Sequence, residues 1–186
     1  MIREIKKIER IHIVLIAVGF AFLLVGTLVY LTDRPPEATY FVNRSPVPVH
    51  FTNTFPHLFG AIGLYFPSFV HVLSFSLMTA GILACGKTGG LVVCLGWFTI
   101  DGLFELGQRY GSSAAAYVPG WFKGIPFLEN TANYFRLGTF DPLDIVAAAA
   151  GALAAYLVIL TLDGLAKSQD VESKTNRSNQ WKGTTP

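Results

Sequence analysis

Three polar side chains recur at helical spacing inside an apolar stretch of this sequence. Residues 101–108 read DGLFELGQ, with Asp101, Glu105 and Gln108 at positions i, i+4 and i+7. In an α-helix this spacing puts all three on one face. Ionisable groups at hydrocarbon depth are costly, and by default they mark functional sites. The stretch therefore predicts a polar stripe that faces a pocket instead of lipid.

Further polar residues stand at the ends of neighbouring apolar runs, and together they define the predicted site. A histidine beside carboxylates can act as a general base, and paired carboxylates can separate into an acid and a base. The sequence has no H-E-x-x-H or H-x-H metal pattern, no G-x-S-x-G nucleophile motif and no phosphate-cradling glycine loop. We therefore assign no metal, cofactor or catalytic residue. The predicted polar site comprises His71, Asp101, Glu105, Gln108, Arg136 and Asp144.

Ordinary structural roles compete with this interpretation at nearly every position. Asp141 precedes Pro142, which is a common helix start, and Asp144 then lies in the first turn, where the helix dipole favours an anion. Arg136 could bind lipid phosphates, and a buried histidine such as His71 needs partners in any case. Asp101, the deepest of the group, is the hardest to explain in this way.

The elements that position these residues are four apolar runs. Hydrophobic residues make up 52% of the 186-residue chain and charged residues 14%, against about 25% charged in a soluble domain. Each run has a length suited to crossing about 30 Å of hydrocarbon as a helix. The sequence thus predicts an all-α fold, a small polytopic membrane helix bundle formed by residues 1–166, with a polar, disordered tail at 167–186. The four predicted spans are 11–31, 68–85, 89–108 and 142–162.

The basic residues predict the orientation of the bundle. Most of the 14 Lys and Arg residues lie in the two terminal segments and at Lys87, in the turn after the second span. The positive-inside rule then places both termini in the cytoplasm and the polar site at the outer face. These charges are typical of topology signals, and no nucleic-acid-binding motif accompanies them. We expect membrane lipids, and no nucleic acid, as partners.

The loops and small residues allow further expectations. Residues 57–66 are apolar but too short to span, so they could lie at the interface or dip back among the helices. Aromatic residues within 109–141 suit the outer interface. The two cysteines, Cys85 and Cys94, are expected to pack as small apolar side chains. The sequence AAAAGALAA in the fourth span favours close helix packing, including packing against membrane protein partners.

Three motifs together resemble the VanZ-like membrane protein family. They are HVLSFSLM in the second span, ELGQ at the end of the third, and GTFDPLDIVAAAAGALAAY leading into the fourth, within about residues 65–160. The resemblance carries onto His71, Glu105, Gln108, Asp144 and Gly151. The family's basic residue before TFD falls on Gly138, with Arg136 two residues earlier, and its asparagine in the fourth span falls on Ala148.

The resemblance implies a protein of the bacterial inner membrane with a role at the cell envelope. The family is named for a protein linked to low-level teicoplanin resistance, which suggests a role in antibiotic resistance. One hypothesis is that the outer cluster binds an envelope molecule, either a lipid-linked head group or a glycopeptide. The alternative is a non-catalytic scaffold or accessory subunit of a membrane complex. A weaker alternative is a membrane enzyme that uses the His, Glu and Asp side chains.

Overall fold

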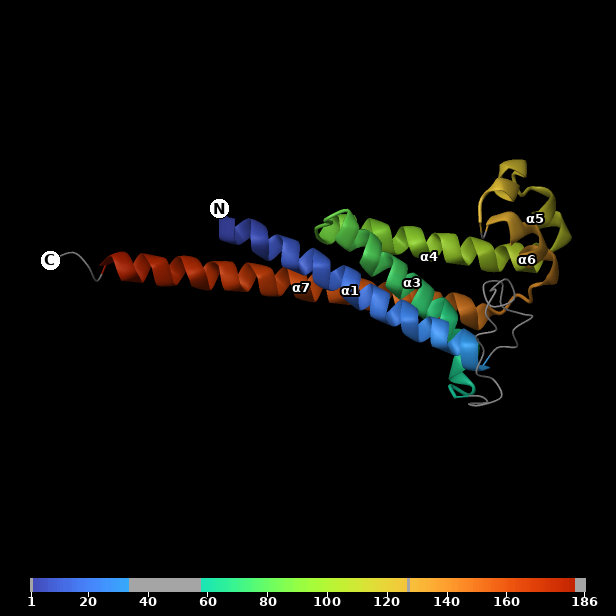
Figure 1. The fold of residues 1–186 in the computed structure, drawn as a ribbon, viewed down its shortest axis with the longest axis horizontal. Helices are drawn as coiled ribbons and strands as arrows, with labels where there is room; N and C mark the ends of the chain where they lie inside the picture. The colour runs from blue at the N-terminus through green and yellow to red at the C-terminus, as the bar shows by residue number, and fades with distance from the viewer. Residues whose placement is uncertain (1, 34–57, 127, 183–186) are drawn as a thin grey trace.

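Four long helices dominate the computed structural model, which describes residues 2–33, 58–126 and 128–182. Stretches long and apolar enough to cross a membrane occupy 10–33, 62–82, 87–110 and 142–165. The described residues contain no strand, and the predicted all-α membrane bundle is confirmed. The four helices are α1 (Ile2–Asp33), α3 (Ile62–Ile82), α4 (Lys87–Tyr110) and α7 (Pro142–Lys182) (Figure 1).

Helix α3 is the central element of the bundle. It has the largest buried share of the four spans, and its main neighbours are α1 and α7. Leu73, Leu77 and Ala80 of α3 join Leu15 of α1 and Ile159 of α7 in the core. Because lipid is as apolar as these side chains, close packing and not water exclusion holds such helices together.

The small residues of α7 are used inside the bundle. Ala148 and Ala155 are fully buried. A Cβ atom added at Gly151 would overlap the backbone carbonyl of Phe69 on α3, so the two helices meet backbone to backbone at this point. The face expected to bind a partner protein is therefore largely occupied by α3.

The second span begins earlier than the sequence predicts. Helix α3 starts at Ile62, so residues 62–66 continue the helix of the second candidate span and do not form a separate segment. Pro67 lies inside the helix, where it lacks the N–H that would bond to Gly63; membrane helices tolerate such interruptions when neighbouring helices support them. Just before α3, the Phe59 N–H donates to Asp33 Oδ2 at 3.0 Å and so holds this segment against the end of α1.

Residues 111–126 and 128–141 build a cap of short helices over one end of the bundle. It contains α5 (Ser112–Ala116), the 3₁₀ turns η2 (Gly120–Gly124) and η3 (Leu128–Asn130), and α6 (Thr131–Leu137). Figure 1 shows α5 and α6 gathered at the end of α4. Trp121 and Tyr117 are exposed on this cap, which suits the aromatic interface expected for the segment.

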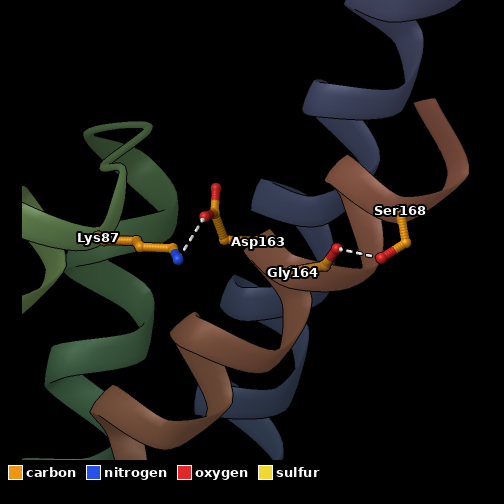
Figure 2. A network of polar contacts seen from close by, with 4 residues as sticks. All are labelled: Lys87, Asp163, Gly164 and Ser168. Carbon is orange, nitrogen blue, oxygen red and sulfur yellow. Dashed lines mark hydrogen bonds and ion pairs between the residues drawn. The ribbon is translucent and has the colours of Figure 1, made fainter. Parts of the chain in front are cut away.

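The opposite end of the bundle carries both chain termini and the turn between α3 and α4 (Figure 1). Lys87 Nζ lies 3.8 Å from Asp163 Oδ2 and connects the start of α4 to α7 (Figure 2). Helix α7 continues to Lys182, so residues 167–182 are helical where the polar composition predicts disorder. Residues 167–182 contain no proline and no glycine. The stretch therefore lacks the two residues that most disfavour a helix.

Candidate polar site

The polar stripe of α4 faces the bundle and the cap. The Glu105 side chain is only 5% exposed, whereas Leu103, on another face of the same turn, is 59% exposed. Asp101 and Gln108 are partly buried. The structure thus places the carboxylates of this helix away from the lipid-facing side.

Gln108 and Tyr134 form the core of a hydrogen-bond network around Glu105. Gln108 Nε2 donates to Glu105 Oε1 at 2.8 Å and to the Tyr134 hydroxyl at 2.9 Å. The Tyr134 hydroxyl also lies 3.5 Å from Glu105 Oε1. Although Tyr134 as a whole is 42% exposed, burial around its hydroxyl, and then the nearby negative charge of Glu105, raise its pKa above the ordinary value. Its phenol therefore stays a hydrogen-bond donor at neutral pH.

Two glycines allow the cap to lie against this network. The Phe135 ring of α6 occupies the space beside Gly107, where any Cβ would overlap it. Gly138, just after α6, leaves room for the Gln108 side-chain oxygen in the same way. A larger residue at Gly107 would displace the Phe135 ring and with it the cap, and one at Gly138 would displace the Gln108 amide. The backbone thus brings Tyr134 within reach of Glu105.

The first turn of α7 adds a third carboxylate. Asp141 Oδ1 accepts from the Leu143 N–H at 2.9 Å, so this residue caps the helix. Asp144 Oδ1 accepts from the Ser68 hydroxyl of α3 at 3.2 Å. Asp101, Glu105 and Asp144 are close enough for their charges to repel one another. The carboxylates of α4 and α7 therefore share one site.

His71 and Asp101 lie on the wall of a neighbouring cavity of about 350 Å³ between α3 and α4. The His71 ring has Tyr30 of α1 at a centroid distance of 6.0 Å and Phe75 at the same distance. Phe75 in turn stacks on Trp97 at 4.8 Å. Trp97 Nε1 donates to Thr79 Oγ1 at 3.0 Å and holds the indole in place.

Two buried carboxylate oxygens lack a hydrogen-bond partner among the described residues. They are Asp101 Oδ2 and Glu105 Oε2. Buried polar atoms are satisfied in the great majority of cases, and an unsatisfied one costs about 1–3 kcal/mol or more when charged. The residues described contain no group of three His, Cys, Asp or Glu side chains suited to a metal. The unfilled positions are acceptors, and they call for hydrogen-bond donors.

Arg136 does not join the site in the way that the sequence suggests. An extended segment before the fourth span would let it reach Glu105 or Asp144. The segment is instead helix α6, and Arg136 sits in its last turn with an exposed side chain. Among the ion pairs of the described residues, none links Arg136 to either carboxylate. Of the six predicted residues, five gather around the cavity and the network, and Arg136 lies outside.

The structure adds residues that the sequence analysis does not assign to the site. Tyr134 carries no spacing signal, since its contact with Gln108 depends on how the cap folds back over α4. Ser68 stands one turn before His71 on α3, so helical spacing puts both on one face. That spacing could have added Ser68 to the predicted site, where it donates to Asp144.

Comparisons with known proteins give no family for this chain. No protein-family model matches it, and neither does any curated protein or solved structure. Its chemistry has to be inferred from the site itself, which combines three carboxylates, an imidazole, an amide and a phenol at one end of a membrane helix bundle.

Proposed function

We propose that this chain is a VanZ-like protein of the bacterial inner membrane whose polar cluster binds the head group of an envelope molecule. In this proposal both termini are cytoplasmic and the cap lies at the outer face. The ligand is a lipid-linked head group or a glycopeptide, and its capture contributes to antibiotic resistance. The motif resemblance and the charge bias of the termini support the proposal.

The observation that carries this proposal is the buried Glu105. Gln108 fixes Oε1, and the Asp141 backbone N–H faces the carboxylate. The other oxygen, Oε2, has no partner at hydrogen-bond distance within the described part of the chain. A purely structural carboxylate would normally have both oxygens satisfied. A head group with hydroxyl, amide or ammonium hydrogens would complete the arrangement, because those groups are hydrogen-bond donors.

Glu105→Gln tests the proposal with little change of shape. The protein, purified in detergent, is titrated with teicoplanin and, separately, with a polyprenyl-linked disaccharide, and bound ligand is counted by native mass spectrometry. The wild type should bind at least one of them. Glu105→Gln should weaken that binding about tenfold or more, since hydrogen bonds to charged groups contribute about 1.5–3 kcal/mol.

Glu129→Gln, the same substitution on η3 of the cap, is the matched control and should bind like the wild type. Equal binding by the wild type and Glu105→Gln would contradict the proposal. If neither probe binds the wild type while the chain co-purifies with other membrane proteins, the scaffold hypothesis gains instead. The burial of Ala148 and Ala155 inside the bundle gives that alternative less support, because a close contact with a partner helix needs small residues at the surface.

A further inference from the structure

The cavity between α3 and α4 combines aromatic rings with a single carboxylate. Its wall includes Phe75, Trp97 and Phe104, together with His71 and Asp101. A volume of about 350 Å³ is at the low end of the range for small-molecule sites, about 300–1,000 Å³. The cavity can thus hold a head group and a short stretch of hydrocarbon, and not an entire lipid.

The cavity lies where α3 and α4 have separated from each other. Helices α3 and α4 leave their shared turn and diverge toward the capped end (Figure 1). The Trp97–Thr79 hydrogen bond joins them on the side of the cavity nearer the turn, and Trp97 itself belongs to the cavity wall. Thr131 of the cap, only 4% exposed, contributes to its wall on that side, whereas Ile100, on α4, is 46% exposed. The wall is thus closed by the cap at one side and exposed along α4, between the two helices.

The chemistry of the wall selects among the molecules that could enter. Aromatic faces attract organic cations, and Trp does so most strongly. Asp101 Oδ2 is buried without a partner in the described chain, so a plain hydrocarbon would leave it unsatisfied. An anionic group would add negative charge beside the three carboxyl groups of Asp101, Glu105 and Asp144, which is unfavourable. An ammonium ion satisfies both the rings and the carboxylate.

We propose that this cavity binds an organic ammonium group carried on a hydrocarbon chain, with Asp101 as its counter-ion and the aromatic wall formed by the stacked Phe75 and Trp97 rings beside it. The ligand arrives through the bilayer and is either an aminolipid or a free lipophilic amine. This inference rests on the proposed function, since the same end of the bundle then receives the envelope molecule, and it specifies the chemical class of that molecule.

Paired probes that differ only in charge test this inference. The full-length protein in a neutral detergent is titrated with dodecylamine and with dodecanol, and bound ligand is counted by native mass spectrometry. Dodecylamine should bind at least about tenfold more tightly, the difference expected for one charge-assisted hydrogen bond. Phosphatidylethanolamine and phosphatidylglycerol nanodiscs then distinguish the sources: enrichment of the former indicates an aminolipid, and binding of dodecylamine without that enrichment indicates a free amine.

Two variants and one control assign the effect to the cavity. Asp101→Asn should abolish the preference for dodecylamine over dodecanol, while Asp163→Asn, the same substitution at the opposite end of the bundle, should retain it. Phe75→Leu keeps an apolar wall and removes a ring, so it should weaken amine binding about twofold to thirtyfold without changing dodecanol binding.

Equal binding of amine and alcohol, or a preference that survives Asp101→Asn, would overturn the inference. The proposed function has a separate test. It fails if Glu105→Gln changes the binding of neither teicoplanin nor the polyprenyl-linked disaccharide. A protein that binds one of those two but shows no amine preference would keep the function and lose only the ammonium site.

Discussion

Gly151→Ala should loosen the contact that positions the fourth span. The new Cβ would overlap the Phe69 carbonyl and crowd the Leu73 backbone nitrogen. Those atoms cannot rotate away as a side chain would, so α7 has to move as a body. Overpacking of this kind costs about 1–3 kcal/mol, and the better helix propensity of alanine returns about 1 kcal/mol. We take the upper end and expect a net loss of about 2 kcal/mol.

The predicted loss can be measured by thermal unfolding in detergent, followed by tryptophan fluorescence. For a chain of this size, 1 kcal/mol corresponds to about 2–4 °C, so Tm should fall by about 4–8 °C. Gly164→Ala is the matched control on the same helix, because nothing lies within 4 Å of a Cβ at that position. It should raise Tm slightly. Identical melting of the two variants would refute the packing argument.

Gly151→Ala should also weaken head-group binding. Asp144 stands seven residues earlier on α7, two turns toward the cap, and reaches Ser68 at 3.2 Å. A shift of the helix lengthens this contact and moves one of the three carboxylates. Lower stability with unchanged binding would show that the site does not depend on the position of α7.

Three further predictions concern the Tyr134 phenol, the Lys87–Asp163 ion pair and the membrane topology. Because burial raises the pKa of Tyr134 in the folded protein, its phenol ionises at lower pH in the unfolded chain. Tm should therefore fall as pH rises above about 10. Melting curves at several pH values should show a smaller fall for Tyr134→Phe. Lys87 and Asp163 form a partly exposed pair, and a double-mutant cycle on unfolding should give a coupling below about 1 kcal/mol. A topology reporter inserted near Ser112 should be active only outside the cell, and one fused at the C-terminus only inside.

Hydropathy and helical spacing suffice to predict most of the fold. The four apolar runs define the spans, because a helix in lipid must satisfy its own backbone and requires about 20 apolar residues. The start of the second span is misplaced because Pro67 suggests a boundary, whereas the surrounding helices support the turn on its N-terminal side. Hydropathy does not predict the α6 helix before the fourth span, because the helix is short. Its position depends on the space left by Gly107 and Gly138.

The candidate site is predictable only where its members share a helix. Asp101, Glu105 and Gln108 follow from spacing along α4, and Asp144 follows from its place at a helix start. Tyr134 could not be predicted, because its position depends on how a cap folds back across 26 residues of sequence to reach Gln108. Periodicity describes contacts within one element, and contacts between elements depend on packing.

The exposure of Arg136 bears directly on the sign of the ligand. Had Arg136 paired with Glu105, the cluster would contain a built-in cation and could accept an anionic head group. Instead Asp101 and Glu105 each keep one buried oxygen without a partner in the described chain. Separating such groups from water is costly, and the cost falls when an opposite charge arrives. A ligand that brings hydrogen-bond donors, and above all a positive charge, therefore gains more from this site than an anion of the same size.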